Sequence, residues 1–214
     1  MPKWIEIASE NLLNKSEEKI DFNIARLEWY FTGEVIDNNE DIDFGGTRPS
    51  CELCEHEDLR WQFTIINKFN VNELKVGSTC IKKFDIVLID DNIEMRGEDR
   101  DKILNKNIRD KIKENDNKKI LIALEQLCIL DIKFKGQIEE AIRQWKKNKA
   151  FSPKMLSLII WRFKINKKEY KSLKFKINLL KSYYKEDLRN MEKFKYDQIR
   201  EYLTNSQQEK YDIV

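Results

Sequence analysis

The chain has 214 residues, of which 41% are hydrophobic and 36% charged, and its formal net charge is +2. The length permits one domain or two small ones, and the hydrophobic content is sufficient for a folded core. No apolar run approaches the roughly 20 residues that a membrane-spanning helix needs. The N-terminus also lacks the charged-then-apolar form of a secretory signal. We therefore expect a soluble cytoplasmic protein with no membrane partner.

The small net charge conceals a division between the two halves of the sequence. Residues 1–100 contain 12 Lys and Arg and 22 Asp and Glu, which gives a net charge of −10. Residues 101–214 contain 28 Lys and Arg and 16 Asp and Glu, which gives a net charge of +12. Such asymmetry indicates either a polyanionic partner for the basic half or contact between the halves. Most of the cations are Lys, beside many Asn and Ile, so AT-rich codon usage accounts for them equally well.

The N-terminal segment is predicted to form short helices followed by a strand. Residues 5–13 have the pattern of a short helix with mixed faces, and residues 24–30 allow another turn or two. Trp29, Phe31 and Val35 then alternate with polar residues, which is typical of a strand.

The next stretch concentrates the metal-binding chemistry of the sequence. Three of the four cysteines and the only histidine lie in 30 consecutive positions, as Cys51, Cys54, His56 and Cys80. A Cys-x2-Cys pair aims two thiolates at one point, and zinc binds four such donors in a tetrahedron. We therefore predict a zinc site with these four ligands. His56 follows Cys54 after one intervening residue, so an acidic side chain or a water remains an alternative fourth ligand.

Redox and catalytic roles fit the cysteines less well than a structural metal. A redox Cys-x-x-Cys motif lies at the N-terminal end of a helix that follows a buried strand. The pair Cys51 and Cys54 is not preceded by such a strand pattern. A deaminase site needs His-x-Glu upstream of Pro-Cys-x-x-Cys, and here the order is reversed. Coincidental burial of the cysteines is a third alternative. We expect the site to be structural.

Residues between the two halves of the site predict a hairpin. Apolar residues alternate with polar ones over 59–65, a turn-like segment covers 67–72, and 73–76 completes the second strand. Gly77 and Ser78 then turn the chain, so that Cys80 begins the next element as in a treble-clef module. An isolated hairpin is marginal in water, whereas structural zinc contributes roughly 10–16 kcal/mol in finger peptides. The metal is thus expected to determine the local fold.

These residues also carry a family resemblance. The motif comprises Leu27-Glu28-Trp29, Cys51-Glu-Leu-Cys54-Glu-His56, Leu59-Arg60, Phe63, Ile65, Asn67, and Leu74-x-Val76-Gly77-Ser78-x-Cys80-Ile81-x-x-Phe84. It resembles a family of small bacterial and phage-encoded zinc proteins, over about residues 24–90. The resemblance implies one module made of knuckle, hairpin and turn, followed by a helical region. It implies no activity.

The C-terminal part is predicted to be mostly helical after a short edge strand at residues 86–89. A helical pattern begins at Glu98, is predicted to break at residues 115–117, and resumes with an apolar face that includes Cys128 as a core residue. Gly136 precedes another helix with a core-facing stripe that ends at Trp145.

Two helix starts have recognisable caps. Ser152 and Pro153 supply an N-cap and a first-turn proline, with Phe151 and Leu156 as a hydrophobic staple, and Thr204 and Gln207 have capping-box spacing. Between them, residues 173–179 alternate, which fits either a strand or an extended entry to a helix over 180–191.

Together these patterns predict an α+β protein. The expected fold is a treble-clef-like zinc module with a small antiparallel sheet at residues 1–96, followed by a basic helical region at 97–214. Neither a P-loop nor a dinucleotide fingerprint occurs, and a Cys-His or Ser-His nucleophile would have to use His56. We expect the protein not to be an enzyme.

Two binding functions remain. The first is a zinc-stabilised nucleic-acid-binding accessory protein that contacts phosphates through its basic half and prefers single strands, because aromatics are interleaved with cations. The candidate contact residues are Lys164, Lys171, Lys174, Lys176, Lys185, Lys193 and Lys195. The alternative, which we favour for any single aromatic, is that these rings form the buried faces of amphipathic helices. The second is a zinc-stapled protein adaptor or inhibitor of phage or mobile-element type, without nucleic-acid contact.

Overall fold

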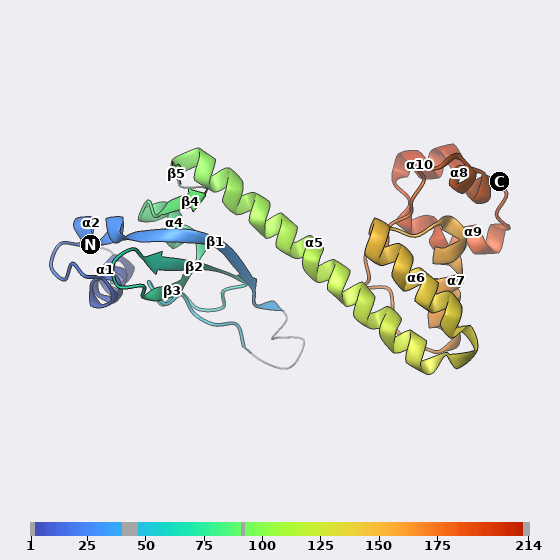
Figure 1. Ribbon diagram of the computed structural model, residues 1–214, viewed down its shortest axis with the longest axis horizontal. Coiled ribbons are helices and arrows are strands. Elements are labelled where there is room, and N and C mark those ends of the chain that lie inside the picture. The colour runs from blue at the N-terminus through green and yellow to red at the C-terminus, as the bar shows by residue number, and fades with distance from the viewer. Residues whose placement is uncertain (1–2, 40–46, 91–92, 212–214) are drawn as a thin grey trace. The chain divides into compact units, whose positions relative to one another are not determined.

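A computed structural model of the chain describes residues 3–39, 47–90 and 93–211 (Figure 1). The chain forms two compact units, Met1–Lys113 (unit 1) and Glu114–Val214 (unit 2). Unit 1 contains a sheet with short helices, and unit 2 is helical, so the α+β class is confirmed. The boundary between the units falls inside one long helix.

Unit 1 is built on a five-stranded sheet with the order β3-β2-β1-β4-β5. The strands are β1 Trp29–Asp37, β2 Trp61–Asn67, β3 Glu73–Val76, β4 Val87–Asp90 and β5 Ile93–Met95. As predicted, β2 and β3 form an antiparallel hairpin. β1 pairs antiparallel with β2 on its other side. The register shifts between Phe31 and Val35. Gly33, inside this shift, has a φ of +87°, which glycine adopts readily, and its carbonyl accepts a hydrogen bond from Asn107.

The sheet differs from the prediction in two respects. It is mixed rather than antiparallel, because β1 and β4 are parallel. β4 is also not an edge strand, since β5 pairs with it on the other side. The chain reaches β4 through the helix α4, Ser78–Lys83, and such a crossover connection permits parallel pairing where a tight turn does not.

The predicted N-terminal helices are present as α1 Lys3–Lys15, α2 Phe22–Ala25 and the 3-10 helix η1 Arg26–Glu28. Glu28 is buried and joins three segments of unit 1. Its carboxylate accepts hydrogen bonds from the backbone N–H groups of Glu17 and Glu18 at 2.8 Å and from the side-chain amide of Asn67 at 2.6 Å. Burial opposes ionisation, but these hydrogen bonds prevail and lower the pKa of Glu28.

The helix α5, Gly97–Leu130, runs without interruption, so the predicted break at residues 115–117 is wrong. Asn and Asp in a helix interior cost only a few tenths of a kcal/mol each relative to good helix formers. Asn115 is moreover buried, which places it among tertiary contacts rather than in a solvated turn. At the other end, Arg100 is buried and donates to the carbonyls of Ile81 and Ile86, which fixes the start of α5 to unit 1.

Unit 2 consists of the end of α5 and a set of shorter helices. These are η2 Ile132–Phe134, α6 Lys135–Asn148, α7 Pro153–Ile165, α8 Ser182–Arg189, α9 Lys193–Ile199, η3 Arg200–Tyr202 and α10 Asn205–Tyr211. Both predicted caps are confirmed: Ser152 accepts from the Met155 N–H, and Thr204 and Gln207 exchange the two hydrogen bonds of a capping box. Phe151 and Leu156 are fully buried, as the staple requires.

The alternating segment before α8 is an extended entry rather than a full strand. Its pairing is a single parallel bridge between Ile177 and Phe151. Leu173 and Phe175 are buried in the core of unit 2, while Lys174 and Lys176 are exposed. The alternation therefore reflects burial of one side of an extended chain.

Candidate metal centre

The loop that carries Cys51 and Cys54 is a closed turn. The N–H of Glu55 donates to the Cys51 carbonyl, and the N–H of Cys51 donates to the His56 carbonyl, both at 2.8 Å. Glu55 has a φ of 59°, a left-handed conformation that reverses the chain at this point. Both cysteine side chains are thereby held on one side of the turn.

Contacts with α1 and β3 fix the turn in place. Leu53 is fully buried, and its carbonyl accepts a hydrogen bond from the Asn11 amide at 3.0 Å. Glu52 pairs with Lys75 of β3 through two hydrogen bonds, one from its N–H and one to its carboxylate. The turn is therefore positioned by the same hairpin that leads to the third cysteine.

Cys80 lies in the first turn of α4, Ser78–Lys83, directly after β3. Gly77 caps this helix with extended backbone, and its N–H donates to the Cys51 sulfur at 3.4 Å. One residue thus both directs Cys80 toward the turn and contacts a sulfur of the turn.

The three sulfur atoms converge. The Sγ atoms of Cys51, Cys54 and Cys80 all lie within 4.8 Å of one another, and those of Cys51 and Cys80 are 3.7 Å apart. All are free thiols. The predicted association of these three residues is confirmed, and the cluster could hold a metal ion with soft thiolate ligands.

Hydrogen bonds within the cluster separate the acidities of its thiols. The hydrogen bond from Cys80 lowers the pKa of Cys51 to about 5, assisted by backbone N–H groups of Cys54, Gly77 and Leu53. The same hydrogen bond raises the pKa of Cys80 far above its usual range, and burial raises the pKa of Cys54. A cation bound between these sulfurs would replace their protons and stabilise the thiolates.

The fourth predicted ligand, His56, is exposed and does not belong to the group of converging ligand atoms. It does line the same hollow, of about 540 Å³, as the three cysteines. Glu55 and Asp58 line this hollow too, so the alternative acidic ligands are also present there. Cys128 lies partly buried against the core of unit 2 and is not part of the cluster.

Two tryptophans in the wall of the hollow were not anticipated. The Lys83 ammonium lies 4.1 Å from the centroid of the Trp4 ring, and the Arg60 guanidinium lies 4.6 Å from that of Trp61. No local pattern identifies this arrangement, because Trp4 lies in α1, Lys83 in α4 and Trp61 at the start of β2, and the three line one hollow only in the folded unit.

The seven candidate phosphate-binding lysines are distributed over unit 2. They lie on α7 (Lys164), the extended segment (Lys171, Lys174, Lys176), α8 (Lys185) and α9 (Lys193, Lys195). Lys174 pairs with Asp116 at 3.1 Å and Lys195 with Glu192 at 2.8 Å. Within the described ranges, the other five make no ion pair with a carboxylate.

The aromatics interleaved with these lysines are mostly internal. Phe163, Phe175 and Tyr196 are buried in the core of unit 2, as expected for amphipathic segments. Tyr183 and Phe194 are 49% and 60% exposed. Few of the rings proposed for base stacking are therefore accessible.

Comparisons of the chain with protein-family models, curated proteins and solved structures give no match. Across the part of the chain that the structure describes, no helix combines the length and apolar character needed to cross a bilayer.

Proposed function

We propose that the protein is a non-catalytic zinc protein in which the metal is bound by Cys51, Cys54 and Cys80, with His56 as the fourth ligand. Zinc–thiolate bonds of about 2.3 Å in a tetrahedron would separate two sulfurs by about 3.8 Å. The separation of 3.7 Å between Cys51 and Cys80 supports this assignment. Bound there, zinc would crosslink the turn to α4, and His56, which lines the same hollow, would complete the ligand set.

The order of elements supports a treble-clef-like description of the site. A cysteine turn is followed by the β2–β3 hairpin and then by a helix whose first turn carries the last cysteine. In this arrangement the metal would join the turn to the helix, which is a structural role rather than a catalytic one.

The proposed activity is nucleic-acid binding through unit 2. Residues 114–214 contain 23 Lys and Arg against 14 Asp and Glu, a balance of +9. Five of the seven candidate lysines have no carboxylate partner among the described residues, which leaves their charge available to phosphates. This is the observation on which the proposal rests. Contacts to phosphates carry no base preference, so we expect weak sequence selectivity.

Fluorescence anisotropy with short DNA and RNA at several salt concentrations tests the activity. Four to six phosphate contacts predict a slope of log affinity against log salt of roughly −3 to −5, from about 0.7 to 0.9 per phosphate. Reversal of charge at Lys171 and Lys176 should reduce the slope and leave the zinc content unchanged. The matched reversal at Lys3 and Lys15 of α1 should have no effect. No binding to any oligonucleotide at low salt would reject the activity.

A protein partner is the second candidate. At the end of α5, Ile129, Leu130 and Ile132 are 77%, 51% and 80% exposed, and adjacent exposed apolar residues are typical of contact surfaces. In this case the protein would act as an adaptor or inhibitor, and its acidic half would mimic the charge of a nucleic acid. Substitution of all three residues by Ser should then abolish partner binding without changing the zinc content.

A further inference from the structure

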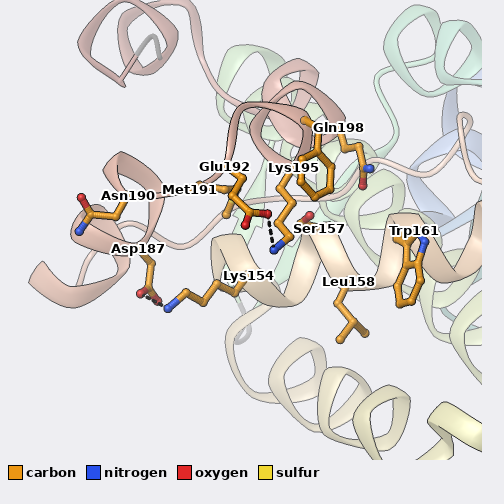
Figure 2. A pocket seen from close by; sticks show the side chains of 11 residues that line it. Lys154, Ser157, Leu158, Trp161, Asp187, Asn190, Met191, Glu192, Lys195 and Gln198 are labelled. Carbon is orange, nitrogen blue, oxygen red and sulfur yellow. Dashed lines mark ion pairs between the residues drawn. The ribbon is translucent and has the colours of Figure 1, made fainter. Parts of the chain in front are cut away.

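A groove of about 650 Å³ lies in unit 2, bounded by α7, α8 and α9 (Figure 2). Its size falls within the range of small-molecule binding sites. The walls are largely apolar, with Leu158 and Trp161 from α7, Phe194 from α9, and Met191 from the connection between α8 and α9. Among the lysines predicted to contact nucleic acid, Lys195 lines this groove.

Trp161 offers the groove a fixed aromatic surface. Its ring makes a perpendicular contact with Phe134 at 5.6 Å, and the Arg162 guanidinium lies 4.6 Å from its centroid. Arg162 is in turn held by a buried ion pair with Asp131 at 2.5 Å. Trp161 nevertheless remains 41% exposed. A flat ligand could therefore stack on a ring whose orientation is already set.

One polar atom of the groove lacks a partner. The Oε1 atom of Gln198, which lines the groove, is buried and has no hydrogen-bond partner among the described residues. Buried polar groups are normally satisfied, so an unsatisfied one that lines a groove indicates a ligand that supplies the donor. Ser157, a second polar residue of the lining, is only 5% exposed.

Cations lie at the edge of the groove. Lys154 pairs with Asp187 at 2.6 Å and Lys195 with Glu192 at 2.8 Å (Figure 2). Both lysines are exposed, and exposed pairs of this kind exchange partners at little cost. The balance of +9 in unit 2 favours a ligand that carries negative charge.

We propose that this groove binds one unstacked base of a single-stranded nucleic acid. The base would stack on Trp161 and Phe194, its hydrogen-bonding edge would face Ser157 and Gln198, and its phosphates would lie near Lys154 and Lys195. A nucleobase combines these features, because it has a flat apolar face, donors and acceptors on one edge, and an attached anion. The inference rests on the proposed nucleic-acid function and assigns its site of base contact.

The experiment compares the wild type with Trp161→Leu. The probe is a labelled single-stranded oligonucleotide of about 12 nucleotides, within the usual site sizes. Inorganic polyphosphate, which has charge but no bases, is the second probe. Phe69→Leu, an exposed aromatic substitution in unit 1, is the control. If the circular dichroism spectrum of Trp161→Leu shows a loss of helix, the variant Phe194→Leu is tested in its place.

Loss of one stacking contact should lower oligonucleotide affinity about tenfold. The salt slope should be unchanged, because no phosphate contact is removed. Polyphosphate should bind the wild type and the variant equally, and Phe69→Leu should match the wild type on both probes. Equal oligonucleotide affinity of Trp161→Leu and wild type would overturn the groove assignment while the proposed function stands; a protein ligand would then fit the groove better. No binding of the wild type to either probe at low salt would reject the proposed function and this inference together.

Discussion

Unit 1 and unit 2 each have a hydrophobic core, but they differ in the polar interaction that connects distant segments of the chain: a cysteine cluster in unit 1 and a buried ion pair in unit 2. In unit 1 two members of the core are cysteines, Cys51 and Cys80, whose sulfurs meet between a loop and a helix. In unit 2 the core is aliphatic and aromatic, and the Asp131–Arg162 ion pair lies buried beside it. A metal can therefore crosslink unit 1, whereas unit 2 depends on packing and on the buried Asp131–Arg162 ion pair. The two units should therefore respond to different perturbations.

The largest effect is expected from Cys80→Ser. A serine hydroxyl is a poor replacement for a thiolate, so the variant should lose the metal and most of its soluble yield, since structural zinc contributes roughly 10–16 kcal/mol in small domains. Metal analysis and yield measure the result. Cys128→Ser, which is outside the cluster, should retain both. If Cys80→Ser retained its full metal content, Cys80 would not be a metal ligand, and the proposed metal crosslink in unit 1 would be contradicted.

A second perturbation should affect unit 2 alone. Arg162→Met removes the cation paired with the buried Asp131 carboxylate, which retains the hydrogen bond from the Asn166 amide. Loss of one partner of a buried ion pair typically costs about 3–5 kcal/mol. Urea denaturation followed by helical circular dichroism should show this loss, with unchanged metal content. The exposed pair between Arg143 and Glu140 provides the control, because Arg143→Gln should change stability by less than about 1 kcal/mol. Equal effects of the two substitutions would show that burial of the first pair is unimportant.

Acid should weaken unit 2 through the same carboxylate. The hydrogen bond from Arg162 lowers the pKa of Asp131 below its ordinary value of 3.8, so the folded state binds this proton less readily than the unfolded state. The resulting stability is fully present above pH 3.8 and is lost as the pH falls through the lower folded pKa. Denaturation midpoints across this window should fall more steeply for the wild type than for Asp131→Asn. Parallel pH profiles would contradict the assignment.

The smallest expected effect is that of a helix cap. Ser152→Ala removes the hydrogen bond to the Met155 N–H and should destabilise unit 2 by about 1 kcal/mol. Thermal denaturation should show a modest shift, with the metal retained. Ser172→Ala, an exposed position outside the helices, should leave the melting temperature unchanged. A loss of metal in Ser152→Ala would mean that the two units are not independent.

Local patterns predicted the elements that local physics determines. The β2–β3 hairpin followed from alternation, the cysteine cluster from ligand spacing, and the caps at Ser152 and Thr204 from side-chain type. Nucleic-acid binding and the zinc identity remain predictions.

Features that depend on tertiary context were not predictable in the same way. The parallel pairing of β1 with β4 depends on a crossover, and the continuity of α5 through Asn115 on burial that the sequence does not display. The Trp161 groove assembles residues from three helices, and the burial of Phe163 and Phe175 was only one of two interpretations of their spacing.

The zinc assignment can be tested by measuring the metal content of the wild-type protein. The protein should be purified without chelator and analysed by inductively coupled plasma mass spectrometry. Convergence of three sulfurs, with His56 in the same hollow, predicts one tightly held zinc per chain. Well under one zinc per chain, in soluble protein with intact secondary structure, would contradict the zinc assignment.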